Sequence, residues 1–148
     1  MTSLFAGQSR EALRRGWVDA WRRGRDSVVL TPLESQIVAV VREHPEYHAW
    51  LESGERALAQ EFSPEDGTAN PFLHMSMHLA VREQAGTDRP AGIASLHAAL
   101  AARLGSAHAA EHAMMEALGE ALWQAQRRGT APDEAAYIES LRRLAARR

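Results

Sequence analysis

The sequence predicts an all-α protein, and three features carry that prediction. Apolar side chains recur at helical spacing, as along Leu13, Trp17 and Trp21, which would form one face of a helix. Ser, Thr or Asn stands before several such stretches and Gly after them, as is typical of helix starts and ends. No stretch of any length alternates apolar and polar residues as strands do, and no repeat recurs at a fixed period. We therefore expect one compact bundle of about six to seven helices over residues 1–148, mostly antiparallel because the loops are short.

The first helices are expected in residues 9–61. One runs from about residue 9 to 23, with Ser9 as its N-cap and Gly24 as the residue that ends it. Thr31-Pro-Leu-Glu34 has the form of a capping box and opens a second helix, which ends near residue 44 because Pro45 disfavours helical geometry in the residue before it. A short helix beginning at Pro45 and another over residues 55–61 follow, with Gly54 between them. The buried side of the second helix is expected to carry Leu33, Ile37, Val40 and Val41.

The later helices follow a predicted loop over residues 63–69. Asn70 and Pro71 open a helix to about residue 85 that Gly86 closes, and because it is apolar over most of its circumference we expect it to be the central, buried one. A helix over residues 92–103 is expected to stop at Gly105. The longest helix runs from its cap at residue 106 to about 128, where Gly129 ends it. Residues 130–133 start the last helix, whose apolar side carries Tyr137, Ile138, Leu141 and Leu144.

Charge and composition exclude several classes of function. The net charge of −2 gives no electrostatic basis for a nucleic acid or an anionic membrane as the main partner. The chain has no cysteine, which removes disulfides, thiolate ligands and thiol nucleophiles. The first residues lack the apolar segment of a signal peptide, and no run approaches the roughly 20 apolar residues of a membrane span. We expect a cytoplasmic protein, and with no Gly-rich phosphate loop we expect no organic cofactor.

Histidines supply the main functional signal. Six of the seven form three His-x-x-x-His pairs, namely His44/His48, His74/His78 and His108/His112, whereas random placement of seven would give roughly 0.3 such pairs. Residues four apart lie one turn apart on a helix, so two imidazoles at this spacing can share a metal ion. Glu116 and Glu120 continue the four-residue steps after His112, which predicts a ridge of two histidines and two glutamates on one helix.

The histidine pairs lead to one principal hypothesis and one alternative. In the principal hypothesis the primary ligands of a transition metal, Zn or Fe, are His74, His78, His108 and His112. Glu116 would be a further ligand or a general base, and supporting or additional ligands would be His44, His48 and Glu120. In the alternative the histidines are core or cap residues of a non-catalytic protein–protein interaction module. The sequence leaves open whether the protein is an enzyme, which protein partner it has, and whether it forms a homo-oligomer.

Three blocks of the sequence carry a resemblance to a known family. They are His44-Pro-Glu-Tyr-His48, then Asn70-Pro-Phe-Leu-His-Met-Ser-Met-His-Leu-Ala80, and then His112 through Glu116, Gly119 and Glu120 to Trp123-Gln-Ala-Gln-Arg127. With these blocks the chain resembles an uncharacterised bacterial family catalogued as domain of unknown function 1841. The resemblance spans nearly the whole chain and implies a small bacterial cytoplasmic protein, without adding an activity.

Overall fold

The structure is a computed structural model that describes residues 9–26, 28–60 and 70–147. In this part of the chain it contains eight α-helices, one short 3-10 helix and no strand, which confirms the all-α prediction with one helix more than expected. The chain divides into two compact units with their boundary between Leu79 and Ala80, called here the N-terminal and the C-terminal unit. That the two units make up a single domain stays a prediction. None of the described helices combines the length and the apolar character that crossing a membrane requires.

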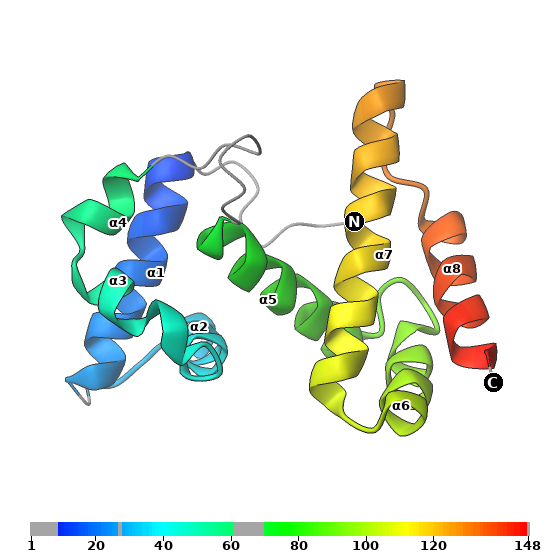
Figure 1. Cartoon of the computed structure of the whole chain (residues 1–148), viewed down its shortest axis with the longest axis horizontal. Helices are drawn as coiled ribbons and strands as arrows, with labels where there is room; N and C mark the ends of the chain where they lie inside the picture. The colour runs from blue at the N-terminus through cyan, green and yellow to red at the C-terminus, as the bar shows by residue number, and fades with distance from the viewer. Residues whose placement is uncertain (1–8, 27, 61–69, 148) are drawn as a thin grey trace. The chain divides into compact units, whose positions relative to one another are not determined.

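In its described residues, the N-terminal unit is built from four α-helices, one 3-10 helix and the first part of α5 (Figure 1). They are α1 (Arg10–Arg25), α2 (Pro32–Arg42), the 3-10 helix η1 (Pro45–Tyr47), α3 (His48–Glu52), α4 (Glu55–Ala59) and the beginning of α5 (Pro71–Thr87). The predicted N-caps are present, because the side chain of Ser9 accepts a hydrogen bond from the Ala12 amide and Thr31 and Glu34 form a complete capping box. Asn70 accepts hydrogen bonds from the amides of Phe72 and Leu73 and so caps α5. The predicted loop over residues 63–69 lies outside the described residues.

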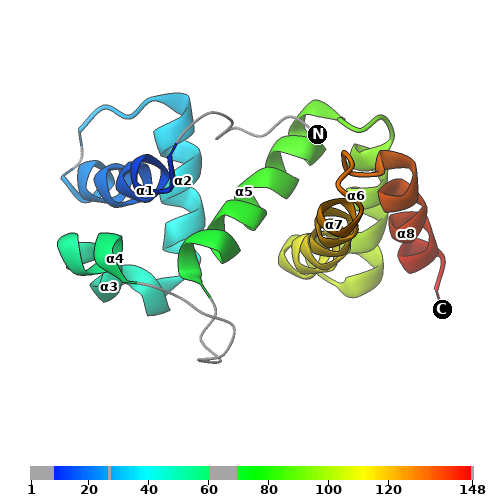
Figure 2. The same cartoon turned by 90° about the horizontal axis from the view of Figure 1, so that it is seen from above.

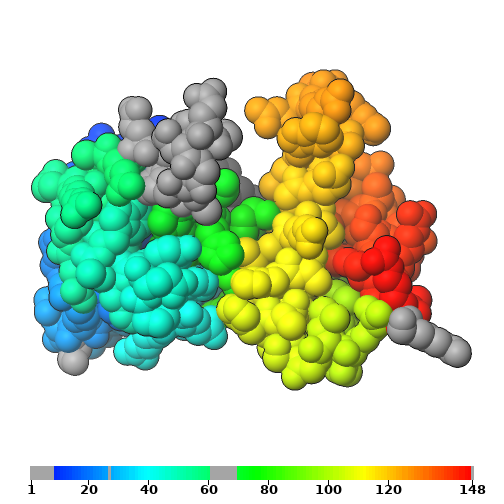
Figure 3. Space-filling model, in the orientation of Figure 1, coloured from blue at the N-terminus to red at the C-terminus, as the bar shows by residue number. Residues whose placement is uncertain are grey.

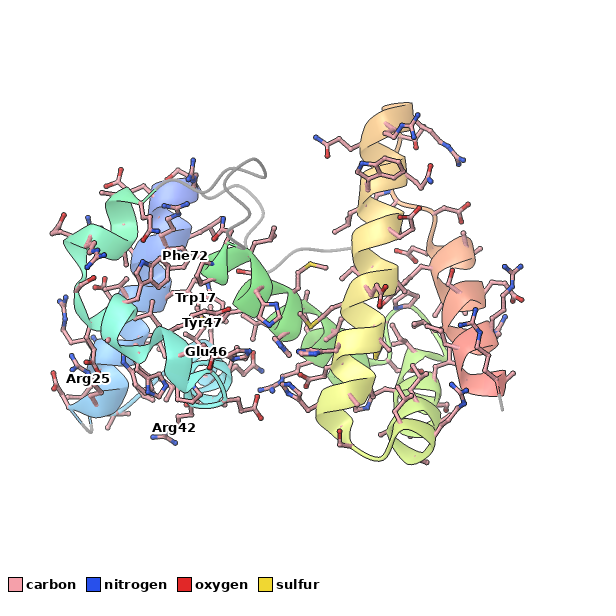
Figure 4. The ribbon with its side chains drawn as sticks, in the orientation of Figure 1. Trp17, Arg25, Arg42, Glu46, Tyr47 and Phe72 are labelled. Atoms are coloured by element: carbon pink, nitrogen blue, oxygen red, sulfur yellow. The ribbon has the colours of Figure 1, made fainter. Side chains whose placement is uncertain are left out.

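The core of the N-terminal unit lies between α1, α2, the short helices α3 and α4, and α5. Figure 4 shows Trp17, Tyr47 and Phe72 in this region, while Arg25 and Arg42 lie at its edge. The buried apolar side chains of the cluster are Trp17, Val18, Ala20, Trp21, Ile37, Val38, Val40, Val41, Leu51, Ala57, Phe72, Met75 and Leu79. Of the side chains predicted to be buried in α2, Leu33 is an exception, because it is 38% exposed in the first turn of the helix.

Two glycines predicted to end helices lie inside them instead. Helix α1 continues through Gly24 to Arg25, and α5 continues through Gly86 to Thr87. At Gly24 the reason is tertiary, since a Cβ atom there would lie 2.8 Å from Cγ2 of Val38 in α2. Gly24 therefore permits the close approach of α1 and α2. At Gly86 a Cβ would meet no atom within 4 Å, so no packing contact explains that glycine.

The C-terminal unit consists of the end of α5 followed by α6 (Ile93–Leu104), α7 (Ala107–Arg128) and α8 (Glu134–Ala146). Gly105 and Gly129 adopt positive φ at the ends of α6 and α7, and Ser106 caps α7, as the sequence predicts. Helices α6, α7 and α8 pack on one another, and Figures 1 and 2 show α7 and α8 side by side with opposite chain directions. The last turns of α7, orange in Figure 3, extend beyond α8 and carry Trp123, which is 49% exposed.

Two polar contacts hold the end of α5 to the other helices of the C-terminal unit. The hydroxyl of Tyr137 in α8 donates a buried hydrogen bond of 2.7 Å to the side-chain oxygen of Gln84. Arg82 forms an ion pair with the buried carboxylate of Glu111 in α7, with Nε 2.7 Å from Oε1 and Nη2 3.3 Å from Oε2. Because two parallel hydrogen bonds fix the relative orientation of both groups, this pair sets how α5 and α7 meet.

Candidate metal centre

Three histidines of the N-terminal unit come together although two of them are 30 residues or more from the third in the sequence. Each of His44, His74 and His78 offers a ring nitrogen that lies within 4.8 Å of those of the other two. The ring centroids are 5.2 Å apart for His44 and His74, 4.8 Å for His44 and His78, and 4.9 Å for His74 and His78. His44 and His78 are buried, and His74 is partly buried.

Local structure explains why these side chains meet. His74 and His78 lie one helical turn apart on α5, so their side chains project from the same face. His44 stands between the end of α2 and η1, where Pro45 disfavours continuation of the helix and His44 adopts φ −125° and ψ 65°. The chain turns at this point, and the His44 ring contacts the α5 pair.

A backbone hydrogen bond fixes the orientation of the His44 ring. Its Nδ1 lies 2.7 Å from the carbonyl oxygen of Val40, and because a carbonyl can only accept, Nδ1 carries the proton and donates. In the neutral ring the lone pair then lies on Nε2, which is the atom that would bind a metal. Metal-bound histidines commonly donate their other ring N–H to a carboxylate, a backbone carbonyl or water, which sets the tautomer and the ring plane.

One aromatic side chain lies against the face of the His44 ring. The ring of Tyr47 stacks on that of His44, with centroids 5.6 Å apart and an interplanar angle of 7°, and Tyr47 lies beside Trp50 in turn. Burial raises the pKa of the Tyr47 hydroxyl, and the negative charge of Glu46 raises it further. Tyr47 is therefore a neutral phenol at neutral pH, and its ring restricts the movement of His44.

The dimensions of the group suit a transition-metal ion after a small adjustment. If no two of the three nitrogens are more than 4.8 Å apart, some point lies at most about 2.8 Å from each of them. Zn–N bonds measure about 2.0–2.1 Å, so each nitrogen has to move inward by at most about 0.7 Å. Side-chain rotations of a few tens of degrees give such shifts. Three imidazole nitrogens converging on one point form the protein part of a four-coordinate site.

His48, the partner of His44 in the first predicted pair, does not belong to this group. Its Nε2 donates a hydrogen bond of 2.7 Å to the carbonyl oxygen of Val41, and its ring packs against Trp21 with centroids 4.4 Å apart. Both contacts lie within the N-terminal unit, and a role of His48 as a supporting or additional ligand stays a prediction. The sequence pairs His44 with His48, whereas the structure groups His44 with the pair on α5.

The predicted ridge on α7 is present as a row of exposed side chains in the C-terminal unit. The rings of His108 and His112 lie 4.3 Å apart, and both residues are exposed. Glu116 and Glu120 are also exposed, and Glu120 accepts a hydrogen bond of 3.0 Å from Gln124. Among the described residues no carboxylate takes part in a three-residue group with metal-ligand spacing. A role of these two glutamates as ligands or as a general base stays a prediction.

Two residues that support the candidate site were not singled out as such from the sequence. Tyr47 was part of the His44–His48 block without a role of its own, and the Val40 carbonyl has no sequence signal at all. A tyrosine three residues after a histidine, across a proline, is compatible with stacking. Only the turn at Pro45, however, brings the two rings face to face.

Comparisons with known proteins identify the family. No curated protein and no solved structure matches the chain. One family model matches residues 9–143, which include both histidines on α5, the His44–His48 block and all of α7. The chain therefore belongs to the family described as domain of unknown function 1841.

Proposed function

We propose that this protein binds one transition-metal ion through His44, His74 and His78. The observation that carries the proposal is the convergence of three ring nitrogens within 4.8 Å of one another, two of them on buried side chains. The Val40 carbonyl also orients the His44 ring in a way that is common for metal-bound histidines.

The donor set narrows the choice of metal. Imidazole nitrogen suits Zn, Cu, Fe and Ni, whereas added carboxylates favour Fe and Mn. Of the two metals expected from the sequence, Zn²⁺ fits a group of three imidazoles better than Fe²⁺ does. The glutamates that favoured iron belong to α7 and not to this group.

The test is the metal content of tag-free protein purified without nickel resin or chelator. We expect close to one zinc ion per chain, and binding of one Zn²⁺ ion per chain by protein that was first stripped with chelator. Protein that contains no zinc, iron or other transition metal, and takes up none when it is supplied, would contradict the proposal.

A matched pair of variants assigns the ion to these residues. His74→Ala removes a partly buried ligand and should abolish stoichiometric binding. His97→Ala removes a histidine on α6 that is equally partly buried and belongs to no such group, so its metal content should equal that of the wild type. Equal metal content in both variants would exclude His74 as a ligand.

The alternative, an interaction module with structural histidines, draws support from His48, whose contacts are a backbone carbonyl and a tryptophan ring. The two proposals differ in how metal affects stability. An ion that binds only the native state must raise the melting temperature, and at an ion concentration 100 times Kd the gain is about 2.7 kcal/mol. In an interaction module the melting temperature would be the same with and without Zn²⁺.

The predicted contribution of His108 and His112 to metal binding stays a prediction, and variants decide it. If the α7 pair supplies ligands, the double variant His108→Ala/His112→Ala weakens Zn²⁺ binding. If it does not, the double variant binds Zn²⁺ with the affinity of the wild type. A competition titration against a chromophoric chelator measures the difference in Zn²⁺ affinity. Neither result affects the conclusion drawn from comparing His74→Ala with His97→Ala.

A further inference from the structure

We infer that the metal ion held by His44, His74 and His78 takes a small inorganic anion from solution as a further ligand. This inference rests on the proposed function and deepens it by naming the class of exogenous ligand. It starts from the charge of the donor set. Three neutral imidazoles bring no negative charge, so a divalent ion bound by them keeps both of its positive charges.

Burial makes that charge costly unless an anion accompanies it. His44 is 3% exposed and His78 is fully buried, so the ion lies in a region with little water to solvate it. Buried charges in proteins are paired for this reason. The acidic residues nearest in sequence, Glu43 and Glu46, are exposed, and no carboxylate oxygen of the described chain belongs to the three-histidine group.

The coordination number of Zn²⁺ also favours a ligand from solution. Zn²⁺ in proteins is almost always four-coordinate, and sites with three protein ligands complete the shell with water or an exogenous ligand. The three histidines supply three donors from two segments, the η1 turn and α5. A small anion in the remaining position completes the shell and lowers the net charge in the same step.

The surroundings of the group restrict the anion to a small one. Tyr47 stacks on the face of His44 with 5.6 Å between ring centroids, and the centroids of the His74 and His78 rings lie 5.2 and 4.8 Å from that of His44. His74 is the one member of the group that is only partly buried, so entry from solvent is expected beside it. We therefore expect monatomic or linear triatomic anions as ligands, and azide is a suitable probe.

The experiment uses the full chain loaded with Co²⁺, which occupies nitrogen sites of this kind and has visible absorption bands that depend on its ligands. Sodium azide is titrated into the loaded protein, and sodium perchlorate, which coordinates weakly, is the control at equal ionic strength. We expect azide to shift the position and intensity of the cobalt bands along a saturable curve, and perchlorate to leave them unchanged. Bound cobalt whose spectrum does not respond to azide would overturn the inference and leave the metal site standing.

Two variants show whether azide binds to the metal ion at the three histidines or elsewhere on the protein. His97→Ala should reproduce the wild-type response, and His74→Ala should lose both the bound cobalt and the azide response. A chain that binds no cobalt at all refutes the metal site itself, and the inference with it. An azide response that persists in His74→Ala with unchanged cobalt content would show that the anion binds elsewhere, which also overturns the inference.

Discussion

Replacing Gly24 with alanine tests the close packing of α1 on α2. The added Cβ would lie 2.8 Å from Cγ2 and 3.1 Å from Cγ1 of Val38, against ordinary contacts of 3.4–4 Å. Val38 is 2% exposed, and a valine in a helix has essentially one accessible rotamer. With both methyl groups facing Gly24, rotation of Val38 does not relieve the clash. The two helices have to separate instead, which costs about 1–3 kcal/mol.

A gain in helix propensity opposes this cost. Alanine is favoured over glycine in a helix by about 1 kcal/mol at most, and by less in the last turn, where Gly24 lies. We therefore expect Gly24→Ala to lower the free energy of unfolding by about 1 kcal/mol. The control is Gly16→Ala in the same helix, where a Cβ would meet no atom within 4 Å. That variant should raise the free energy of unfolding by about 0.5–1 kcal/mol.

A double-mutant cycle isolates the clash. Val38→Ala removes both methyl groups and leaves a cavity, so alone it should destabilise by about 1–3 kcal/mol. In that background Gly24→Ala meets no obstacle and should become neutral or stabilising, which gives a coupling of about 1–3 kcal/mol. Urea denaturation followed by circular dichroism measures all four free energies. If Gly24→Ala has the same effect in both backgrounds, the contact with Val38 does not explain the glycine.

Three further predictions concern the candidate site and the C-terminal unit. Tyr47→Ala should weaken Zn²⁺ binding about 10-fold or more in a competition titration, whereas Tyr47→Phe should preserve it. The reason is that the stacked ring, and not the hydroxyl, restrains His44. Equal weakening in both variants would show that the hydroxyl is needed. Glu111→Gln should destabilise by about 2–3 kcal/mol in urea denaturation, because a neutral amide replaces the buried carboxylate that pairs with Arg82. A loss below about 0.5 kcal/mol would show that this ion pair contributes little to stability. Burial raises the pKa of Tyr137 above the value of about 10 in unfolded chains, so the folded state keeps the proton longer and stability should fall as pH rises past about 10. Urea denaturation between pH 8 and 11 checks this, and Tyr137→Phe should show a smaller fall than the wild type.

Local signals explain how much of the fold could be predicted. The capping box at Thr31 and the N-caps at Ser9, Asn70 and Ser106 depend on hydrogen bonds between residues two or three positions apart, so the sequence displays both partners. The left-handed glycines after α6 and α7 are equally local. The prediction that Gly24 ends the first helix was wrong, because the role of this glycine depends on its contact with Val38 in another helix.

The candidate site shows the same division between local and long-range information. The i, i+4 spacing of His74 and His78 is a local property, and it is sufficient to place both residues on one face of a helix. The choice of His44 as the third member was not local, because His44 was paired with His48 in the sequence. The turn at Pro45 and the packing of α5 in the N-terminal unit selected His44 and directed His48 to Trp21.

The sequence by itself determined that the chain is all-α, where most of its helices begin, and that histidines one turn apart are its most distinctive polar feature. These properties follow from backbone hydrogen bonding and side-chain spacing within a few residues. Tertiary structure alone decided that His44 joins His74 and His78, that Tyr47 covers His44, and that Glu116 and Glu120 on α7 are exposed. The physical reason is that contacts between distant segments depend on how whole helices pack, and that is fixed by the summed burial of many side chains and not by any single motif.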